Sequence, residues 1–279
     1  MPSYSGKHCV MATKHAKQKP VSAVFENRLG LKVFRADVDT DQLGTFTGEI
    51  ERQFSAKDAA YAKCELGLQW AAKNAVKAPF AVSSEASFVS HPHIPWVAMA
   101  QEILCFVDRL HGFCLYEIEN SVQTNFCGQQ IESVDELMRF AERARFPDHA
   151  LIVRGNGWIE KGITTYESLQ REYERARNSL MGAPVMVETD MRAHMNPTRM
   201  GRIKQLAETL AMRLLQHCPK CECPGWGKVG VELGLPCGVC GCETECIGSI
   251  VLGCPKCLHK EIEPVSGCAD PQYCSFCNP

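Results

Sequence analysis

Residues 218–277 read CPKCECPGWGKVGVELGLPCGVCGCETECIGSIVLGCPKCLHKEIEPVSGCADPQYCSFC, and this stretch decides how the carboxyl-terminal part of the chain folds. It holds 12 of the 17 cysteines, and eight of them form four Cys-x-x-Cys pairs. A Cys-x-x-Cys turn aims two thiolates at one point, and two turns supply the tetrahedral sulfur set that zinc prefers. The spacing predicts two zinc ribbons in tandem. The eight predicted ligands are Cys218, Cys221, Cys237, Cys240, Cys254, Cys257, Cys274 and Cys277.

A disulfide framework is the main alternative for so many cysteines. The amino terminus, MPSYSGKHCV (residues 1–10), has no apolar signal core that would route the chain to an oxidising compartment, so metal-bound thiolates are favoured. An iron–sulfur cluster, which also uses four cysteines, is a minor alternative. The spacing leaves open whether neighbouring pairs each share a zinc or alternate pairs interleave in a cross-brace.

Four cysteines of the stretch lie outside the pairs. We interpret them as small hydrophobic side chains, with a third metal site as the alternative. They are Cys223, Cys242, Cys246 and Cys268.

Length and charge bound the class of protein. The chain has 279 residues, which predicts an α/β domain over residues 1–217 followed by the cysteine-rich domain over residues 218–279. The formal net charge of −2 and the pI of about 6.5 give no global basic surface for nucleic acid or an anionic membrane. No apolar run approaches the ~20 residues that span a bilayer. We therefore expect a soluble, cytoplasmic protein.

Strand and helix patterns alternate along residues 8–217. Short apolar runs predict strands at residues 8–13, 31–34, 79–82, 103–107, 113–118, 149–153 and 185–187. Periodic patterns with capping residues predict helices at residues 20–29, 55–76, 133–145, 168–180 and 197–217. This alternation predicts the α/β class, with a mixed sheet that carries helices on both faces.

The segment ETDMRAHMNPTRM (residues 188–200) joins an expected strand to the last long helix. Asn196 followed by Pro197 is typical of an N-cap and a first-turn proline. Because backbone N–H groups at a helix start attract anions, we predict a phosphate or carboxylate site here. Its candidate ligands are Arg192, His194, Asn196 and Arg199. The alternative is that Asp190 and the arginines pair with each other to hold the loop.

The first expected strand also ends in a polar turn, TKHAK (residues 13–17), directly before its helix. A lysine in that position can reach a phosphate cradled by the turn, so Lys17 is a candidate catalytic residue. By itself this signal is weak, because solvated lysines are common.

Two acidic segments offer ligands for a magnesium ion. The loop GTFTGEIER (residues 44–52) places Glu49 and Glu51 next to glycines, which suits an ion that keeps several waters. The segment SSEASF (residues 83–88) follows the third expected strand, and its Glu85 could serve as a general base or a second metal ligand. Each segment alone is more typical of a cap or a loop contact.

Taken together, these features resemble house-cleaning nucleotide pyrophosphatases of the inosine/xanthosine triphosphatase type. The resemblance covers residues 8–90 and implies magnesium-dependent hydrolysis of nucleoside triphosphates, with Lys17 on phosphate and Glu49 and Glu85 in catalysis. It rests on Thr13, Lys17, Gly44, Thr45, Phe46, Glu49, Ala62, Lys63 and Glu85.

Nearly the whole chain also resembles a bacterial family of uncharacterised proteins, a domain of unknown function that ends in a double zinc ribbon. The resemblance brings no activity with it. It rests on the motifs GTFTGE (residues 44–49), TDMRAH (189–194), NPTRM (196–200), GLPC (234–237) and the ending CSFCNP (274–279).

Two functions follow as competing expectations. The first is a magnesium-dependent nucleotide or phosphate-ester hydrolase that carries structural zinc ribbons. The second is a non-catalytic zinc-ribbon module that binds protein or nucleic acid. Residues 218–279 contain four lysines, no arginine and seven acids, so this balance disfavours nucleic acid and leaves protein contact or a purely structural role.

Overall fold

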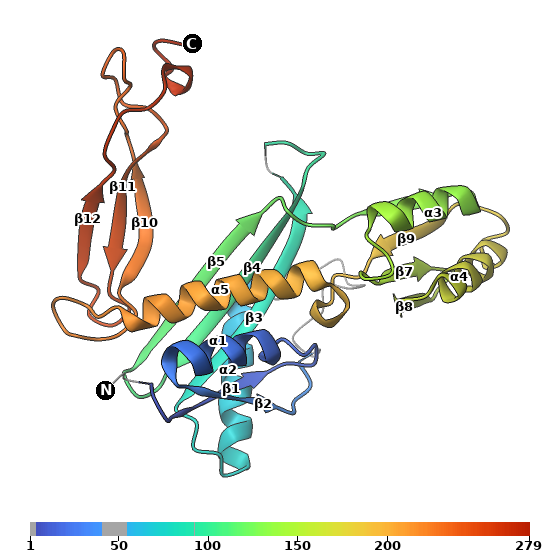
Figure 1. The fold of residues 1–279 in the computed structure, drawn as a ribbon, viewed down its shortest axis with the longest axis horizontal. Coiled ribbons are helices and arrows are strands. Elements are labelled where there is room, and N and C mark those ends of the chain that lie inside the picture. Colours follow the sequence, from blue (N-terminus) through green and yellow to red (C-terminus); the bar gives the residue numbers. More distant parts are fainter. Residues whose placement is uncertain (1–3, 41–54, 92) are drawn as a thin grey trace.

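The computed structural model describes residues 4–40, 55–91 and 93–279 (Figure 1). A five-stranded sheet forms the centre of the amino-terminal part, in the order β2-β1-β3-β4-β5. Strand β1 is parallel to β2 and β3, whereas β3, β4 and β5 pair antiparallel, so the sheet is mixed as predicted. Its strands are β1 (His8–Ala12), β2 (Lys32–Ala36), β3 (Phe80–Ser90), β4 (Ala98–Asp108) and β5 (Phe113–Ser121).

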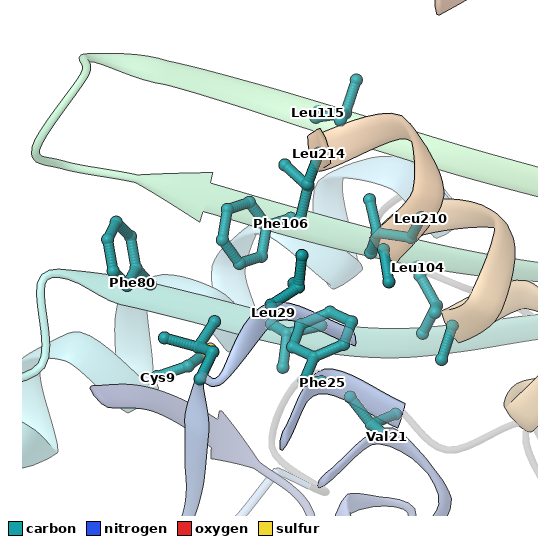
Figure 2. Close-up of a cluster of buried hydrophobic side chains, with 14 of the residues drawn as sticks. Cys9, Val21, Phe25, Leu29, Phe80, Leu104, Phe106, Leu115, Leu210 and Leu214 are labelled. Atoms are coloured by element: carbon teal, nitrogen blue, oxygen red, sulfur yellow. The ribbon is translucent and has the colours of Figure 1, made fainter. Parts of the chain in front are cut away.

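Helices cover both faces of this sheet, which confirms the predicted α/β class. Helices α1 (Gln18–Leu29) and α5 (Pro197–Leu215) share one buried cluster with β1, β3, β4 and β5, part of which is drawn in Figure 2. In that cluster Phe25, Phe106 and Leu210 are completely buried. Helix α2 (Ala56–Lys73) packs on the opposite face through a second cluster built on small side chains such as Ala60 and Cys64.

A second sheet lies between β5 and α5 in the chain. Its order is β6-β9-β7-β8, and all of its pairs are antiparallel. The strands are β6 (Gly128–Ile131), β7 (Leu151–Arg154), β8 (Ile159–Ile163) and β9 (Val185–Thr189), and the helices are α3 (Val134–Arg143) and α4 (Tyr166–Ser179). These elements share a separate buried cluster around Phe140, Leu169 and Tyr173. The expected strands at residues 149–153 and 185–187 therefore exist, but they belong to this second sheet. Local periodicity could not show the division, because it does not identify a strand's partner.

The helix starts follow the capping residues in the sequence. Ser55 accepts the amide of Asp58, and Asn196 accepts the amide of Arg199 at 3.0 Å with Pro197 in the first turn of α5. Such caps satisfy amides that have no partner inside the helix. The predicted starts of α2 and α5 are confirmed.

Strand β3 is longer than predicted, and this changes the position of Glu85. We expected the strand to end at Val82, with Glu85 in a following loop. Instead β3 continues to Ser90, and Glu85 stands opposite Ile103 of β4. Serines at positions 83, 84 and 87 are typical of a loop sequence. In the structure these residues pair with β4, which provides hydrogen-bond partners for their backbone groups.

Residues 218–279, which we call the cysteine module, form a narrow sheet that stands away from the α/β part (Figure 1). Its antiparallel strands are β10 (Gly227–Leu233), β11 (Ile247–Gly253) and β12 (Lys260–Pro264), in the order β10-β11-β12. Most side chains of β10 and all of those of β12 are exposed. So thin a sheet has little apolar core, and such modules usually depend on metal for their fold.

Candidate metal centres and a buried charged cluster

Two groups of four cysteines converge in the cysteine module. The ligand atoms within each group lie within 4.8 Å of one another, as a metal site requires. We call Cys218, Cys221, Cys254 and Cys257 the base centre, and Cys237, Cys240, Cys274 and Cys277 the tip centre. Both groups could hold a metal ion such as zinc.

The sulfur spacing fits metal coordination and not disulfides. Four pairs of sulfur atoms, two in each centre, are 3.5–3.9 Å apart, far beyond a disulfide bond of about 2.05 Å. Four sulfurs placed tetrahedrally around zinc at about 2.3 Å would lie about 3.8 Å apart. The thiols therefore already stand near coordination distance, and all 17 cysteines are free.

The centres interleave, which settles the pairing that the spacing left open. The first and third Cys-x-x-Cys pairs form the base centre, and the second and fourth form the tip centre. The reason is the antiparallel sheet: β10 carries the chain from base to tip, β11 returns it, and β12 carries it out again. Consecutive pairs thus lie at opposite ends of strands that span about 3.3 Å per residue.

Three of the four cysteine turns share one backbone geometry. The residue after the second cysteine is left-handed, with φ of 57° at Glu222, 73° at Gly241 and 60° at Leu258. The first cysteine of each turn then donates its amide to the carbonyl five residues later, at 2.8–2.9 Å. Backbone amides also point at sulfur, and they lower the pKa of Cys237 and of Cys257 to about 7. A lowered thiol pKa favours the thiolate that metals bind.

The base centre is continuous with the α/β core. Cys218 and Cys254 belong to the same buried cluster as Leu214 of α5. Arg213, at the end of α5, donates to the Gly225 carbonyl at 3.1 Å and pairs with Glu117 of β5 at 2.7 Å. Helix α5 ends at Leu215, two residues earlier than predicted and three residues before Cys218.

The tip centre has no such support. Cys237 and Cys274 are buried, but among the described residues neither belongs to a hydrophobic cluster. Large apolar side chains around it face solvent instead: Val239 is 74% exposed and Phe276 is 75% exposed.

The cysteines outside the pairs differ in their surroundings. Cys223 is a buried core residue, and burial raises the pKa of its thiol to about 11. Cys242 and Cys268 are exposed, and Cys246 is half-buried. Within the described ranges, none of the four is part of a metal-binding group.

A second candidate site is a cluster of buried charged side chains. It lies beside β3 and β4, next to the turn that joins β1 to α1. Lys17, which is only 6% exposed, donates to the Ser84 carbonyl at 2.8 Å. Glu85 is ion-paired with Lys63 of α2. We call the set of Lys17, Lys63, Glu85, Glu102 and Arg199 the charged cluster.

Glu102 of the charged cluster binds Arg199 and Ser84. It accepts two hydrogen bonds from the Arg199 guanidinium, at 3.0 and 3.2 Å, and one from the Ser84 hydroxyl at 2.6 Å. Arg199 also donates to the Met191 carbonyl at 2.6 Å, and it stacks over the Phe88 ring. These bonds offset the cost of burying charge.

Within the described ranges, Lys17 is the cation of the cluster that has no ion pair with a carboxylate. Burial, followed by repulsion from Arg199, lowers the pKa of Lys17 from 10.5 to about 7, although Glu85 acts in the opposite direction. Shifts of this size gather at functional sites more often than elsewhere.

The residues predicted for the anion site separate into two groups. Arg199 joins the charged cluster, whereas Arg192 binds both carboxylate oxygens of the fully buried Asp190, at 2.5–3.0 Å. The Arg192–Asp190 pair is the alternative stated for this segment, in which Asp190 and an arginine pair with each other to hold the loop. Gly162 leaves space for the Arg192 side chain, because a Cβ at position 162 would lie 2.9 Å from it.

His194 and Asn196 occupy different places around the same turn. His194 is exposed and stacks on His15 with ring centroids 4.9 Å apart, so it does lie beside the turn that carries Lys17. Partial desolvation of the ring and the nearby Arg192 lower the pKa of His194. Asn196 is committed to capping α5 and to Asn125, to which it donates at 2.9 Å. The magnesium candidates Glu49 and Glu51 lie outside the described residues.

Sequence reasoning missed Glu102 and gave no role to Ser84. Glu102 directly precedes the apolar run ILCFV (residues 103–107). A charged residue beside a run that predicts a buried strand was the available signal for a buried carboxylate. Lys63 had entered only through a family resemblance.

Comparisons with known proteins give a family but no activity. The family described as "Domain of unknown function (DUF6671)" matches residues 63–279, so the chain belongs to it. The resemblance to a bacterial family of uncharacterised proteins is thereby confirmed. The search of curated proteins and the search of solved structures gave no match. The likeness to inosine/xanthosine triphosphate pyrophosphatases receives no support, and the family match leaves out Thr13 and Lys17. Among the described residues, no helix is long and apolar enough to cross a membrane.

Proposed function

We propose that the α/β part binds a phosphate-bearing small molecule at the charged cluster, and that two structural zinc ions hold the cysteine module. The observation that carries the first proposal is the burial of Lys17, which is only 6% exposed and donates to the Ser84 carbonyl at 2.8 Å. Among the described residues, Lys63 is paired with Glu85 and Arg199 with Glu102. The Lys17 amine, with its pKa near 7, can take up a proton when an anion binds beside it.

The placement of the cluster supports a ligand site. Its members come from α1, α2, β3, β4 and α5, elements that are far apart in the sequence. Burying an ion pair costs desolvation free energy that can exceed the attraction between the charges. Buried ion pairs are therefore weak evidence that these residues serve stability alone. Lys17 also stands at the N-cap position of α1, in the turn that follows β1, and ligands of open α/β sheets bind where strands lead into helices.

For the metal, the donor set supports zinc. Four thiolates close a tetrahedral site and leave no open position for a substrate, so zinc here would act in folding and not in catalysis. We expect two zinc ions per chain in protein purified without added metal. Elemental analysis that finds less than one metal ion per chain would contradict this.

Anion binding is tested by substitution of Lys17. We expect at least one compound from a panel of standard and damaged nucleoside triphosphates, with magnesium, to raise the melting temperature of the wild-type protein. Lys17→Met should weaken that binding by about 1.5–3 kcal/mol, the value of a charge-assisted contact. Lys14→Met is the matched control, because Lys14 is an exposed lysine on the same turn that pairs with Asp39 at 2.6 Å. A panel that never shifts the wild-type protein contradicts the proposal.

The pH dependence gives an independent check. Because the Lys17 pKa is lower in the folded state, the unfolded chain binds the extra proton between pH 7 and pH 10.5. Wild-type stability should therefore rise with pH in this window, relative to Lys17→Met, by up to about 1.4 kcal/mol per pH unit. Phosphate binding should take up a proton above pH 7. If the free energies of unfolding of the two proteins change with pH in parallel, Lys17 is not buried as a neutral amine.

Hydrolysis is the finer part of the proposal. Glu85 is the candidate base, and Lys63 holds its carboxylate in place. If the bound compound is a substrate, Glu85→Gln should reduce magnesium-dependent phosphate or pyrophosphate release by about 100-fold. If the compound binds but is not hydrolysed, the binding proposal stands and the hydrolysis proposal is wrong.

The second candidate function is recognition of a protein by the cysteine module. Apolar side chains on its strands face solvent, among them Leu233 at 61% and Ile262 at 55% exposure. Nucleic acid is disfavoured, since four lysines stand against seven acids in the module.

A further inference from the structure

A groove separates the five-stranded sheet from the base of the cysteine module. Its volume is about 630 Å³. One wall is the middle of β5, residues 114–118, and the other is formed by the start of β10, the end of β11 and the turn that follows it. Figure 1 shows the module rising from this end of the sheet.

The β5 wall is a free sheet edge. Strand β5 is last in the order β2-β1-β3-β4-β5, and within the described part of the chain no strand pairs with its outer side. Leu115 and Glu117 point toward α5, whereas Cys114 and Tyr116 pack toward the α2 face, so the groove runs along the edge itself. A free edge offers a row of backbone donors and acceptors to another chain.

The lining is strongly positive in a chain of net charge −2. It contains four cations and one carboxylate, Glu117, which already pairs with Arg213. The other three cations have no carboxylate within 4.0 Å among the described residues, and all three are exposed. They are Lys57, Lys228 and Lys260.

Apolar side chains lie between these lysines. Leu258 is 76% exposed, Val229 is 49% exposed and Ile118 is 39% exposed. All three line the groove. A row of apolar contacts flanked by unpaired lysines suits a strand whose side chains alternate between apolar and acidic.

We propose that this groove binds an acidic protein segment in extended conformation, which adds as a sixth strand along β5. The segment supplies carboxylates to Lys228 and Lys260 and apolar side chains to Val229 and Leu258. The proposal rests on the second candidate function, recognition of a protein by the cysteine module. Five groove residues of β5 correspond to a segment of about 17 Å.

A protein segment fits better than nucleic acid. A protein that makes about 6–10 phosphate contacts binds nucleic acid through many cations, whereas the groove offers three lysines that are outside ion pairs among the described residues. Its aromatic residue, Tyr116, already lies under Lys57, with the ammonium 5.8 Å from the ring centroid. Backbone pairing to an edge strand is also available only to a polypeptide.

The test is peptide binding to the full-length, metal-loaded protein, measured by fluorescence anisotropy. An array of labelled peptides of about eight residues alternates Asp or Glu with Val, Ile or Leu, and a matched array carries Lys or Arg instead. We expect the best acidic peptides to bind about tenfold or more tightly than the best basic ones, with an affinity that falls as salt rises.

Charge reversal in the groove locates the site. Lys228→Glu with Lys260→Glu should weaken acidic peptides by about tenfold or more. The control is Lys220→Glu with Lys256→Glu, which makes the same charge change on exposed lysines of the same module outside the groove. Methylation of alternate peptide amides should abolish binding in one register and spare it in the other, as strand addition requires.

Four outcomes overturn the proposal. They are equal binding of the acidic and basic arrays, equal losses from the groove and control variants, insensitivity to amide methylation, and an oligothymidylate that binds the groove where no peptide does. If peptide binding is lost on Val239→Ser with Phe276→Ser at the tip but not in the groove variant, protein recognition stands and the groove assignment is wrong.

Discussion

The base centre and the tip centre each contain four cysteine ligands on Cys-x-x-Cys turns, but their surroundings differ. The base centre shares a buried cluster with Leu214, and Arg213 ties it to both α5 and β5. At the tip, side chains such as Val239 and Phe276 face solvent. Identical metal chemistry should therefore have different consequences for folding: the base centre should fold together with the α/β core, and the tip centre should stabilise its own end of the sheet.

The largest effect is expected from Cys254→Ser at the base. This change removes one of four ligands and places a hydroxyl in the apolar cluster that contains Leu214. We expect a loss of about 3 kcal/mol or more, which corresponds to a fall of roughly 10 °C in the main melting transition. Calorimetry with metal analysis measures both. Cys242→Ser is the control, because this cysteine is exposed and lies outside both centres.

A smaller effect is expected from Arg213→Met, which cuts the link between the base and the core. The Arg213 side chain is 10% exposed, and its removal leaves Glu117 without its partner. The expected loss is about 2–3 kcal/mol in urea unfolding. Arg202→Met is the matched control: it breaks the Arg202–Glu119 pair of the same helix and strand, which is more exposed, and should cost about 1 kcal/mol or less. Equal losses would show that the base is not specially anchored.

The smallest effect on the main transition is expected from Cys274→Ser at the tip. Metal content should fall from two ions to one per chain, while the main melting temperature changes by about 2 °C or less. Hydrogen exchange should accelerate at the tip, in residues 235–246 and 265–279, and stay slow around Cys218. A fall as large as that of Cys254→Ser would show that the module and the core unfold as one unit, and the proposed difference would then be wrong.

Local patterns carried much of the fold. Ser55 and Asn196 start α2 and α5 because a cap depends only on residues three positions away. Gly30, with φ of 64°, ends α1 for an equally local reason. The eight cysteine ligands were predicted from spacing alone, since each pair is built on a single turn. The α/β class followed from the alternation of helix and strand patterns.

Other features depended on partners that local patterns do not specify. Glu85 was expected in a loop, and only its pairing with β4 places it inside a strand. Lys17 was a candidate on its own turn, but its low pKa arises from burial and from Arg199, which lies 182 residues away. The two sheets of residues 1–217 were not separable either, because buried strands look alike whichever sheet they join.

The sequence by itself thus determined the metal ligands, the starts of α2 and α5, the end of α1 and the fold class, all of which depend on neighbours along the chain. Only the tertiary structure decided which cysteine pairs share a centre, because antiparallel strands place alternate pairs at opposite ends. It likewise decided which centre joins the core and which charges surround Lys17. These contacts join residues that are distant in sequence, and strand order and packing set them, not spacing along the chain.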